Sequence, residues 1–344
     1  MRILIVGADS NYAIERPYVK YLAAIAGVSS VDFFKAQNLF LDYYQKSVVN
    51  KILYRSGLSN ILRQVNLKLK EVVVEKAPDV IWVFKGLEIF PETLEWIRNR
   101  EIKIVNYNPD NPFVFSGRGS GNKNISKSIG LYHMHFTYDA TVKKRIQDEF
   151  GITCSVLPFG FDLPHEVLEK SKQQQEVVKT CFLGSADQYR GKFINQLAKL
   201  GISVDVYGNG WNDFIKNKNI KIHKAVYGDD FWYVLRKYRI QLNLMRPHNP
   251  NSHNMRTFEV PGVGGILLAP DTEDHQKLFT AEKEIFLYNG LNDCSEKINA
   301  ILNLSSPASD EIRKAAATRS VLSGYSYRDR ANYVVGEFRN LLNE

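Results

Sequence analysis

"SHNMRTFEVPGVGGILLAP", residues 252–270, places one Arg and one Glu just before a run of small residues and a strand-like apolar segment. A polar loop that enters a short helix at Arg256 would present backbone N–H groups, which attract phosphate oxygens, and the Arg adds a charge-assisted clamp. Glu259, one turn further on, can accept hydrogen bonds from a ribose diol. An acidic first turn stabilised by the helix dipole is the plain alternative. The stretch therefore indicates an anion-binding edge of a parallel sheet, with the glycines as packing room.

Strand-like runs alternate with helical patterns on both sides of this stretch. "RILIVG", "VIWVFKG" and "IKIVNYNPD" are examples in the first half, and "KTCFLGS", "SVDVYGNGW" and "IQLNLM" in the second. This alternation predicts the α/β class, with parallel sheets flanked by helices. Because residues 165–178 are polar like a connector, we expect two Rossmann-like domains, residues 1–170 and 171–325. The helix over residues 326–344 is expected to pack back toward the first domain.

Composition and charge limit the kinds of partner and the cellular location that we expect for this protein. The 344 residues carry a net charge of +8, which suits anionic partners, but no run of five like charges occurs, so no nucleic-acid partner is expected. No signal peptide and no apolar run near the ~20 residues of a membrane span is visible. Three widely spaced cysteines suit a reducing cytoplasm. We expect a cytoplasmic protein, and the basic excess and amphipathic residues 38–76 leave peripheral contact with the inner membrane face open.

Several chemistries lack their motifs. The first strand is not followed by G-x-G-x-x-G, and neither a P-loop nor a G-x-S-x-G elbow occurs, which argues against nicotinamide, P-loop and acyl-hydrolase chemistry. His248 and His253 do not have the spacing that puts two ligands on one helix face. "HMH", residues 133–135, puts both rings on one side of a strand, where buried packing is the favoured interpretation. We expect no metal and no cofactor.

Four segments together resemble a known family. "NMRTFEVPGVGGILLAP", residues 254–270, resembles the donor-binding segment of glycosyltransferases with the GT-B architecture, in particular the CgeB-like, spore-maturation type. "TCFLGSADQYRGKFINQLAKLGISVDVYGNGW" (180–211), "VLPFGFD" (156–162) and "YSYRDRANYVVGEF" (325–338) are similar to other parts of that family. The resemblance covers roughly residues 175–335 and is thin over the first 100 residues.

This resemblance implies two Rossmann-like domains that face each other across a cleft. The second would hold a nucleotide-sugar donor, with UDP favoured as the common case, and the first would hold a saccharide, lipid-linked or protein acceptor. The family needs no obligatory metal. The implied donor-binding residues are Gly184, Ser185 and Arg190 near the phosphates, Gly208 near the nucleobase, Asn254, Met255 and Arg256 at the diphosphate, and Glu259 at the ribose.

The resemblance leaves the stereochemistry of transfer open. Retaining relatives often carry a second Glu several residues before the ribose-binding one, and this chain has Asn251 there. Arg190 and Arg256, with Arg246 in reserve, would stabilise the departing diphosphate.

An inverting enzyme needs a general base from the first domain. The candidates are Asp110, then Asp9, then His135, and either Asp can also be a simple turn residue. Two alternatives to a transferase of a hexose-type sugar remain: an inactive nucleotide-sugar-binding module, and a GT-B epimerase or phosphorylase.

Overall fold

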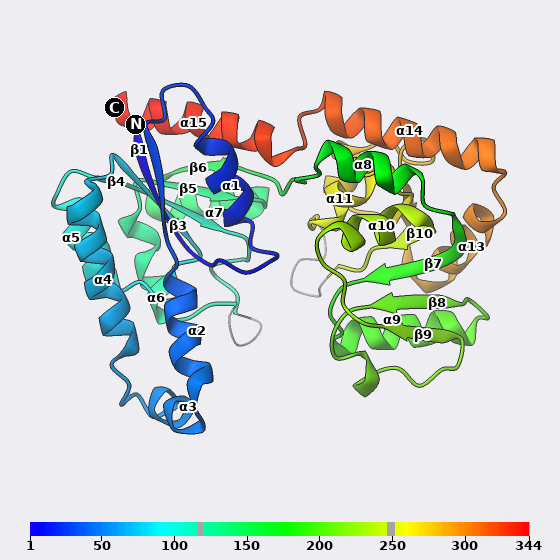
Figure 1. Ribbon diagram of the computed structural model, residues 1–344, viewed down its shortest axis with the longest axis horizontal. Coiled ribbons are helices and arrows are strands. Elements are labelled where there is room, and N and C mark those ends of the chain that lie inside the picture. Colours follow the sequence, from blue (N-terminus) through cyan, green and yellow to red (C-terminus); the bar gives the residue numbers. More distant parts are fainter. Residues whose placement is uncertain (116–119, 246–251, 344) are drawn as a thin grey trace. The chain divides into compact units, whose positions relative to one another are not determined.

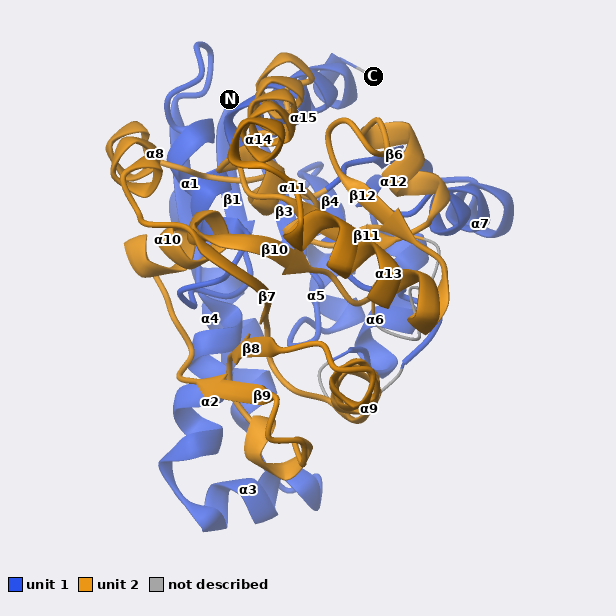
Figure 2. Cartoon of the chain, turned by 90° about the vertical axis from the view of Figure 1, so that its right-hand side faces the viewer, with its two compact units in different colours: residues 1–158, 327–344 blue, residues 159–326 orange. Residues whose placement is uncertain are grey.

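The computed structural model describes residues 1–115, 120–245 and 252–343. The chain divides into two compact units, residues 1–158 with 327–344, and residues 159–326 (Figure 2). The expected boundary at 170 differs from this division, because the polar, helix-permissive stretch from 165 belongs to the second unit. It contains helix α8 (His165–Lys172), which contacts α10 (Asp229–Lys237).

Unit 1, residues 1–158 and 327–344, is built on a six-stranded sheet in the order β2-β1-β3-β4-β5-β6 (Figure 1). Every pairing in it is parallel. The central strand "VIWVF" is buried at all five residues, as expected for a strand covered on both faces. The strands are β1 (Arg2–Val6), β2 (Ser30–Phe34), β3 (Val80–Phe84), β4 (Lys103–Asn108), β5 (Met134–Thr137) and β6 (Thr153–Val156).

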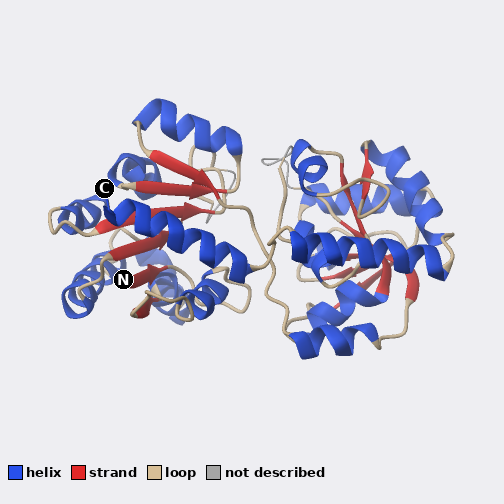
Figure 3. Ribbon diagram, turned by 90° about the horizontal axis from the view of Figure 1, so that it is seen from above, coloured by secondary structure: helices blue, strands red, loops and turns tan. Residues whose placement is uncertain are grey.

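Helices flank this sheet, as the view from above shows (Figure 3). The last of them, α15, packs against α1, and its Phe338 ring meets the buried Trp82 ring of the central strand at 5.5 Å. The helices are α1 (Glu15–Leu22), α2 (Ala36–Lys46), α3 (Val48–Arg55), α4 (Ile61–Lys76), α5 (Pro91–Arg98), α6 (Lys123–Ser128), the 3-10 turn η1 (Ile129–Leu131), α7 (Ala140–Phe150) and α15 (Tyr327–Asn343).

Unit 2, residues 159–326, repeats the architecture with a sheet in the order β12-β11-β10-β7-β8-β9, again all parallel. The strands are β7 (Val177–Leu183), β8 (Val204–Tyr207), β9 (Ile220–His223), β10 (Tyr238–Leu242), β11 (Leu267–Pro270) and β12 (Phe286–Tyr288). The remaining elements are α9 (Gln188–Lys199), the 3-10 turn η2 (Trp211–Asp213), α11 (Arg256–Gly262), α12 (Glu273–Leu278), α13 (Gly290–Leu302) and α14 (Ser306–Leu322).

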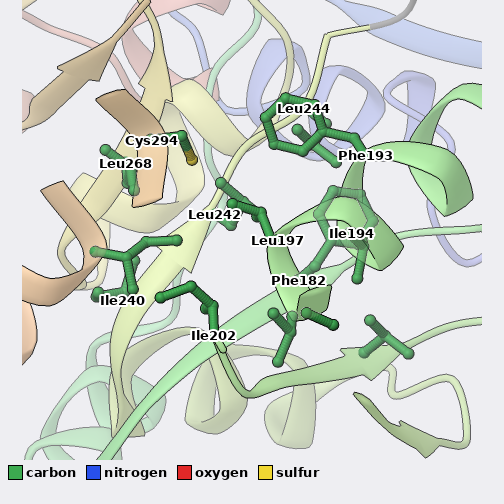
Figure 4. Close-up of a cluster of buried hydrophobic side chains, with 14 of the residues drawn as sticks. Phe182, Phe193, Ile194, Leu197, Ile202, Ile240, Leu242, Leu244, Leu268 and Cys294 are labelled. Atoms are coloured by element: carbon green, nitrogen blue, oxygen red, sulfur yellow. The ribbon is translucent and has the colours of Figure 1, made fainter. Parts of the chain in front are cut away.

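One apolar cluster holds the sheet of unit 2 to its helices (Figure 4). Leu242 and Leu268 of the central strands pack with Ile194 and Leu197 of α9 and Cys294 of α13, all of them buried. Burial of this kind is the main favourable contribution to folding. Both units are therefore Rossmann-like domains with separate cores, as the alternation of patterns predicted.

The strand orders locate the ligand-binding edge of each sheet. In unit 1 the chain runs outward from β1 to β2 and then returns to β3, so the order reverses between β1 and β3. In unit 2 the reversal lies between β7 and β10. Open α/β sheets bind ligands beyond the carboxyl ends of the strands at such reversals.

Candidate functional site

Two glycine loops meet beside the reversal point of unit 2. Gly184 follows β7 and Gly208 follows β8. Gly208 has φ +149°, and a Cβ built there would lie 2.1 Å from the carbonyl oxygen of Gly184. The Trp211 indole donates a hydrogen bond to the same oxygen at 3.0 Å. Only glycine fits this approach, so the two loops at the predicted phosphate and nucleobase positions lie directly against each other.

Arg256, the first residue of α11, is fixed beside these loops. Its Nε donates to the carbonyl oxygen of Leu183, the last residue of β7, at 3.1 Å. Its guanidinium lies over the Phe231 ring, 4.7 Å from the centroid, and the side chain is 24% exposed. The cation is therefore held near Gly184 while part of it stays open to solvent.

Glu259 forms an ion pair with Arg256, one turn away on the same helix. Its side chain is only 8% exposed. Burial raises the pKa of Glu259, and the attraction of Arg256 acts in the opposite direction. The two residues singled out by the opening stretch thus lie in contact and offset each other's charge. Ribose binding by Glu259 stays a prediction.

Asn254 fastens the loop that leads into α11. Its Nδ2 donates to Oδ1 of Asn243, just beyond β10, at 2.7 Å, and its Oδ1 accepts from the Arg256 N–H at 3.0 Å. The Asn254 side chain thus links the backbone of Arg256 to Asn243 and holds the start of α11 in place. Met255, half-buried, immediately precedes α11.

Ser185 and Arg190 complete the donor-side set. The Ser185 carbonyl accepts from Nη1 of Arg190 at 3.0 Å, and the Leu244 carbonyl accepts from Nη2 at 3.5 Å. Asp187 caps α9 by accepting from the Arg190 N–H at 2.9 Å. The structure therefore gathers all eight predicted donor-binding residues on the segments that follow β7, β8 and β10. Arg246, His248 and Asn251 lie outside the described residues.

A buried His pair anchors the same loop from its other side. His253 Nδ1 lies 2.7 Å from an Asp274 oxygen, and His275 Nε2 lies 2.9 Å from Thr257 Oγ1. Burial lowers the pKa of His275 to about 4. Sequence reasoning missed Asp274, although Thr272 two residues earlier is a recognisable helix cap.

In unit 1, both predicted catalytic Asp residues lie at carboxyl ends of strands and carry a cationic partner. Asp110 follows β4 and pairs with Lys85 at 2.6 Å. Asp9 follows β1 and pairs with Lys35 at 2.6 Å and Arg16 at 3.3 Å. The lysine on Asp110 comes from the end of β3, the strand between β1 and β4. The two carboxylates therefore lie along one edge of the sheet.

His135, the third candidate base, lies within β5 and is 3% exposed. Its Nε2 is 2.9 Å from the Ile129 carbonyl oxygen, and its ring meets Tyr132 edge-on. Burial lowers the pKa of His135 to about 4. The imidazole is therefore neutral and hydrogen-bonded inside unit 1, which suits the buried packing favoured for residues 133–135.

The loop after β3, residues 85–90, is a feature that sequence reasoning missed. Lys85 has φ +57° and Gly86 has φ +94°, so two successive residues are left-handed. A non-Gly residue in this region stores strain and persists only where its surroundings fix it. The amides of four asparagines hold the carbonyl or N–H groups of this loop or of the adjoining Val83: Asn66, Asn106, Asn122 and Asn124.

Two buried carboxylates accompany Lys85. Glu15 accepts from the Ala8 N–H at 2.8 Å and fills the space beside Gly7. Glu88 is 7% exposed, and burial raises its pKa to about 7, which the nearby Lys85 counteracts. A carboxyl group that titrates near neutrality is a recognised sign of a functional site. "KGLE" directly after an apolar strand was the signal available in the sequence.

A separate cavity of about 650 Å³ lies in unit 2, beyond the ends of β11 and β12. Asp271, Tyr288, Asp293, Lys297 and Arg319 are among its lining residues. It contains none of the predicted donor-binding residues, so we do not assign it to the donor.

In the described part of the chain, no group of three His, Cys, Asp or Glu side chains is arranged to hold a metal ion. Among the same residues, no helix has the length and apolar character needed to cross a membrane.

Residues 190–336 match a family model described as glycosyl transferase-like. The match includes Arg190, Gly208 and the opening stretch with Arg256 and Glu259. A comparison with curated protein sequences finds no match.

Solved structures share the fold over the whole chain. Sucrose-phosphate synthase from Thermosynechococcus elongatus superposes with a TM-score of 0.73 at 11% identity, covering 100% of this chain and 99% of that one. Anabaena HepE in complex with UDP gives 0.64 at 12% identity, covering 99% and 100%. UDP-GlcNAc 2-epimerase from Neisseria meningitidis bound to UDP-GlcNAc gives 0.60 at 14% identity, covering 99% and 100%. Together, the fold of the whole chain and the family match over residues 190–336 support a glycosyltransferase of the GT-B architecture.

Proposed function

We propose that the protein transfers a hexose-type sugar from a UDP-sugar to a hydroxyl of a saccharide, lipid-linked or protein acceptor. The proposal includes membership of the CgeB-like type, no obligatory metal and a cytoplasmic location. Unit 2 binds the donor, and unit 1 supplies the acceptor side. The structures with UDP or UDP-GlcNAc bound favour this nucleotide class.

One observation carries the proposal: Gly184 and Arg256 lie at the strand reversal of unit 2, and Gly208 packs against Gly184. The absence of a side chain on Gly208 lets the two loops approach closely, and the Leu183 carbonyl holds the Arg256 guanidinium beside them. A departing diphosphate needs positive charge fixed in place before the reaction, because such charge costs no reorganisation in the transition state. Arg190, fixed by two carbonyls, is the second such cation.

Binding of a diphosphate would change the Arg256–Glu259 ion pair. Phosphate oxygens compete for the guanidinium, and the Glu259 carboxylate then becomes available to a ribose diol. The pair thus keeps a buried carboxylate neutralised in the free protein and presents both groups when the nucleotide arrives.

The first experiment is calorimetric titration and thermal shift with UDP, GDP and ADP and their common sugars. A ligand that binds only the folded state raises its stability, so the correct series shifts the melting temperature. In Arg256→Gln/Glu259→Gln, which removes both charges together, we expect roughly tenfold to hundredfold weaker binding, since hydrogen bonds to charged groups contribute ~1.5–3 kcal/mol. Arg145→Gln/Glu149→Gln, which removes an exposed ion pair from α7 of unit 1, is the matched control. Equal affinities in the two variants would remove Arg256 and Glu259 from the site.

A second candidate function rests on the epimerase that shares this fold. Epimers have the same mass, so NMR spectroscopy of a donor and an acceptor incubated with the protein separates the possibilities. Free nucleoside diphosphate with a glycosylated acceptor marks a transferase. A sugar inverted at one carbon, free or still attached to the nucleotide, marks the epimerase class, and a chemically and stereochemically unchanged donor marks a binding module.

Metal independence is tested on the same reaction. Because the proposed phosphate cations are Arg190 and Arg256, we expect turnover to persist in EDTA with less than about a twofold change. Loss of turnover in EDTA, restored by Mg²⁺ or Mn²⁺, would show that a metal supplies the positive charge instead.

A further inference from the structure

Helices α2, α3 and α4 form an excursion of unit 1 that leaves the sheet after β2 and returns to it at β3. Figure 1 shows α3 at the end of this excursion farthest from the sheet. No residue of α3 is buried, although it contains two Val, one Ile, one Leu and one Tyr. A helix that is this apolar and this exposed has a face without a partner in the described structure.

The exposed apolar residues are concentrated at this point. Val48 and Val49 are 70% and 62% exposed, Ile52 is 59% exposed, and Leu58, in the loop that follows, is 76% exposed. Val48 and Ile52 are four residues apart and therefore lie on one face of the helix. We call Val48, Val49, Ile52 and Leu58 the α3 tip.

The inner face of α3 holds the tip in place. Tyr54 packs against Phe40 at 4.8 Å and Tyr44 at 5.6 Å, both on α2. The Asn50 side chain donates to the Tyr43 carbonyl at 2.8 Å. The outer apolar face is therefore presented on a packed support.

The chain segment that forms the tip and its flanks carries charge of one sign. Between Asp42 and Glu71 the chain contains no acidic residue, and it contains six basic ones: Lys46, Lys51, Arg55, Arg63, Lys68 and Lys70. An apolar tip on a positively charged segment matches a surface that is anionic outside and apolar beneath, which is the chemistry of an anionic lipid bilayer.

We propose that the α3 tip docks unit 1 on an anionic membrane surface. Val48, Val49, Ile52 and Leu58 insert at the level of the headgroups, and the basic residues between Asp42 and Glu71 contact lipid phosphates. Binding is peripheral and reversible, because a few apolar side chains do not anchor a protein as a membrane-spanning helix does. This contact would bring unit 1 to lipid-linked acceptors.

The test is sedimentation of the full chain with vesicles of phosphatidylcholine alone or mixed with phosphatidylglycerol. We expect binding only to the anionic vesicles, weakened by salt because exposed charges are screened. Lys46→Gln/Arg55→Gln should weaken binding roughly tenfold or more, at roughly fivefold per cation near an anionic surface. Val49→Ser/Ile52→Ser should weaken it several-fold without loss of folding, since both side chains are exposed.

Matched controls come from unit 2. Val321→Ser/Leu322→Ser removes two other exposed apolar side chains, and Lys216→Gln/Lys218→Gln removes two other exposed charges. Equal effects of control and tip variants, or no binding to anionic vesicles, would overturn the proposal. The rival explanation is that the α3 tip is an interface between two copies of the chain. Light scattering of the free protein tests it: a dimer that is lost in Val49→Ser/Ile52→Ser would support that explanation and overturn the membrane proposal. No nucleotide is needed in these assays, so their outcome is independent of the proposed transfer reaction.

Discussion

Gly208 occupies a position where the backbone of the next loop leaves no room for a side chain. Gly208→Ala would force a Cβ to within 2.1 Å of the Gly184 carbonyl oxygen. We expect a loss of ~2–5 kcal/mol in the free energy of unfolding, the sum of backbone strain and overpacking. Nucleotide affinity should fall as well, because Gly184 must move.

Gly201→Ala is the control for this prediction. Gly201 also has a positive φ, +89°, but nothing lies within 4 Å of the added Cβ. It should lose only the ~1–2 kcal/mol of left-handed strain, with nucleotide affinity unchanged. Urea unfolding and calorimetry of both variants measure the difference, and equal losses would show that the contact with Gly184 does not matter.

Glu88 and Asp110 are distinguished by their partners. Asp110 is neutralised by Lys85, whereas Glu88 is buried with a pKa near 7, the range in which a general base works best. If Glu88 takes the acceptor proton, Glu88→Gln should lower kcat by roughly 10²-fold or more and flatten the rise of kcat/KM near pH 7. If Asp110 is the base, Asp110→Asn should do so instead, with donor affinity retained in both variants.

Glu88→Gln also has an expected effect on stability that does not depend on catalysis. The folded-state pKa lies above the ordinary value of 4.5, so the folded state holds the proton more tightly than the unfolded one. Stability is therefore lost as pH rises from 4.5 to about 7, by ~3 kcal/mol at 1.36 kcal/mol for each pKa unit. Over this pH range the free energy of unfolding of Glu88→Gln should fall less than that of the unsubstituted protein. Equal falls in both proteins, measured by urea unfolding, would show that Glu88 is not held protonated in the folded state.

At the residue scale the sequence could name candidate donor-side positions but not their contacts. Glycines after strands and a lone Arg–Glu pair are visible as patterns, so Gly184, Gly208 and Arg256 could be named. The ion pair between Arg256 and Glu259 joins residues three apart on one helix, a spacing at which side chains are neighbours. The four asparagine amides around residues 85–90 come from segments far apart in the chain, so no local pattern predicts those contacts.

At the scale of elements, α15 is the helix on which unit 1 most visibly depends. Phe338 is fully buried and contacts Trp82 and Phe136 of the sheet. Phe338→Ala should cost ~3–5 kcal/mol of stability, as expected for a large cavity. Leu342→Ala, at a 37% exposed position of the same helix, should change stability by less than about 1 kcal/mol. Similar unfolding curves for the two would show that α15 contributes little.

The elements themselves were largely predictable because each strand is a short apolar run bounded by turn residues. The polar segment at 165–178 was the exception, since eight of its residues form α8. An amphipathic helix with few apolar residues resembles a linker until its partner is known, and the partner here is α10, more than fifty residues later.

At the scale of the whole molecule, buried histidines set part of the response to acid. The pKa values of His135 and His275 lie near 4 because burial disfavours their charged forms. The unfolded chain binds these protons more readily below the ordinary value of 6.5, so stability is lost as pH falls from 6.5 toward 4. His135→Gln should reduce this loss by as much as ~3 kcal/mol. Urea unfolding across that pH range measures it, and an unchanged slope would mean that His135 titrates normally.

The path of the chain through the two units has a consequence for biosynthesis. Unit 1 consists of residues 1–158 and 327–344, so the ribosome makes all of unit 2 before it makes α15. Translation at roughly 5–20 residues per second leaves the Trp82 face uncovered for about ten to thirty seconds. Unit 2 is contiguous in sequence and can complete its fold in that interval. The nascent first sheet therefore needs protection from aggregation until its last helix emerges, which predicts that chaperones bind it during synthesis.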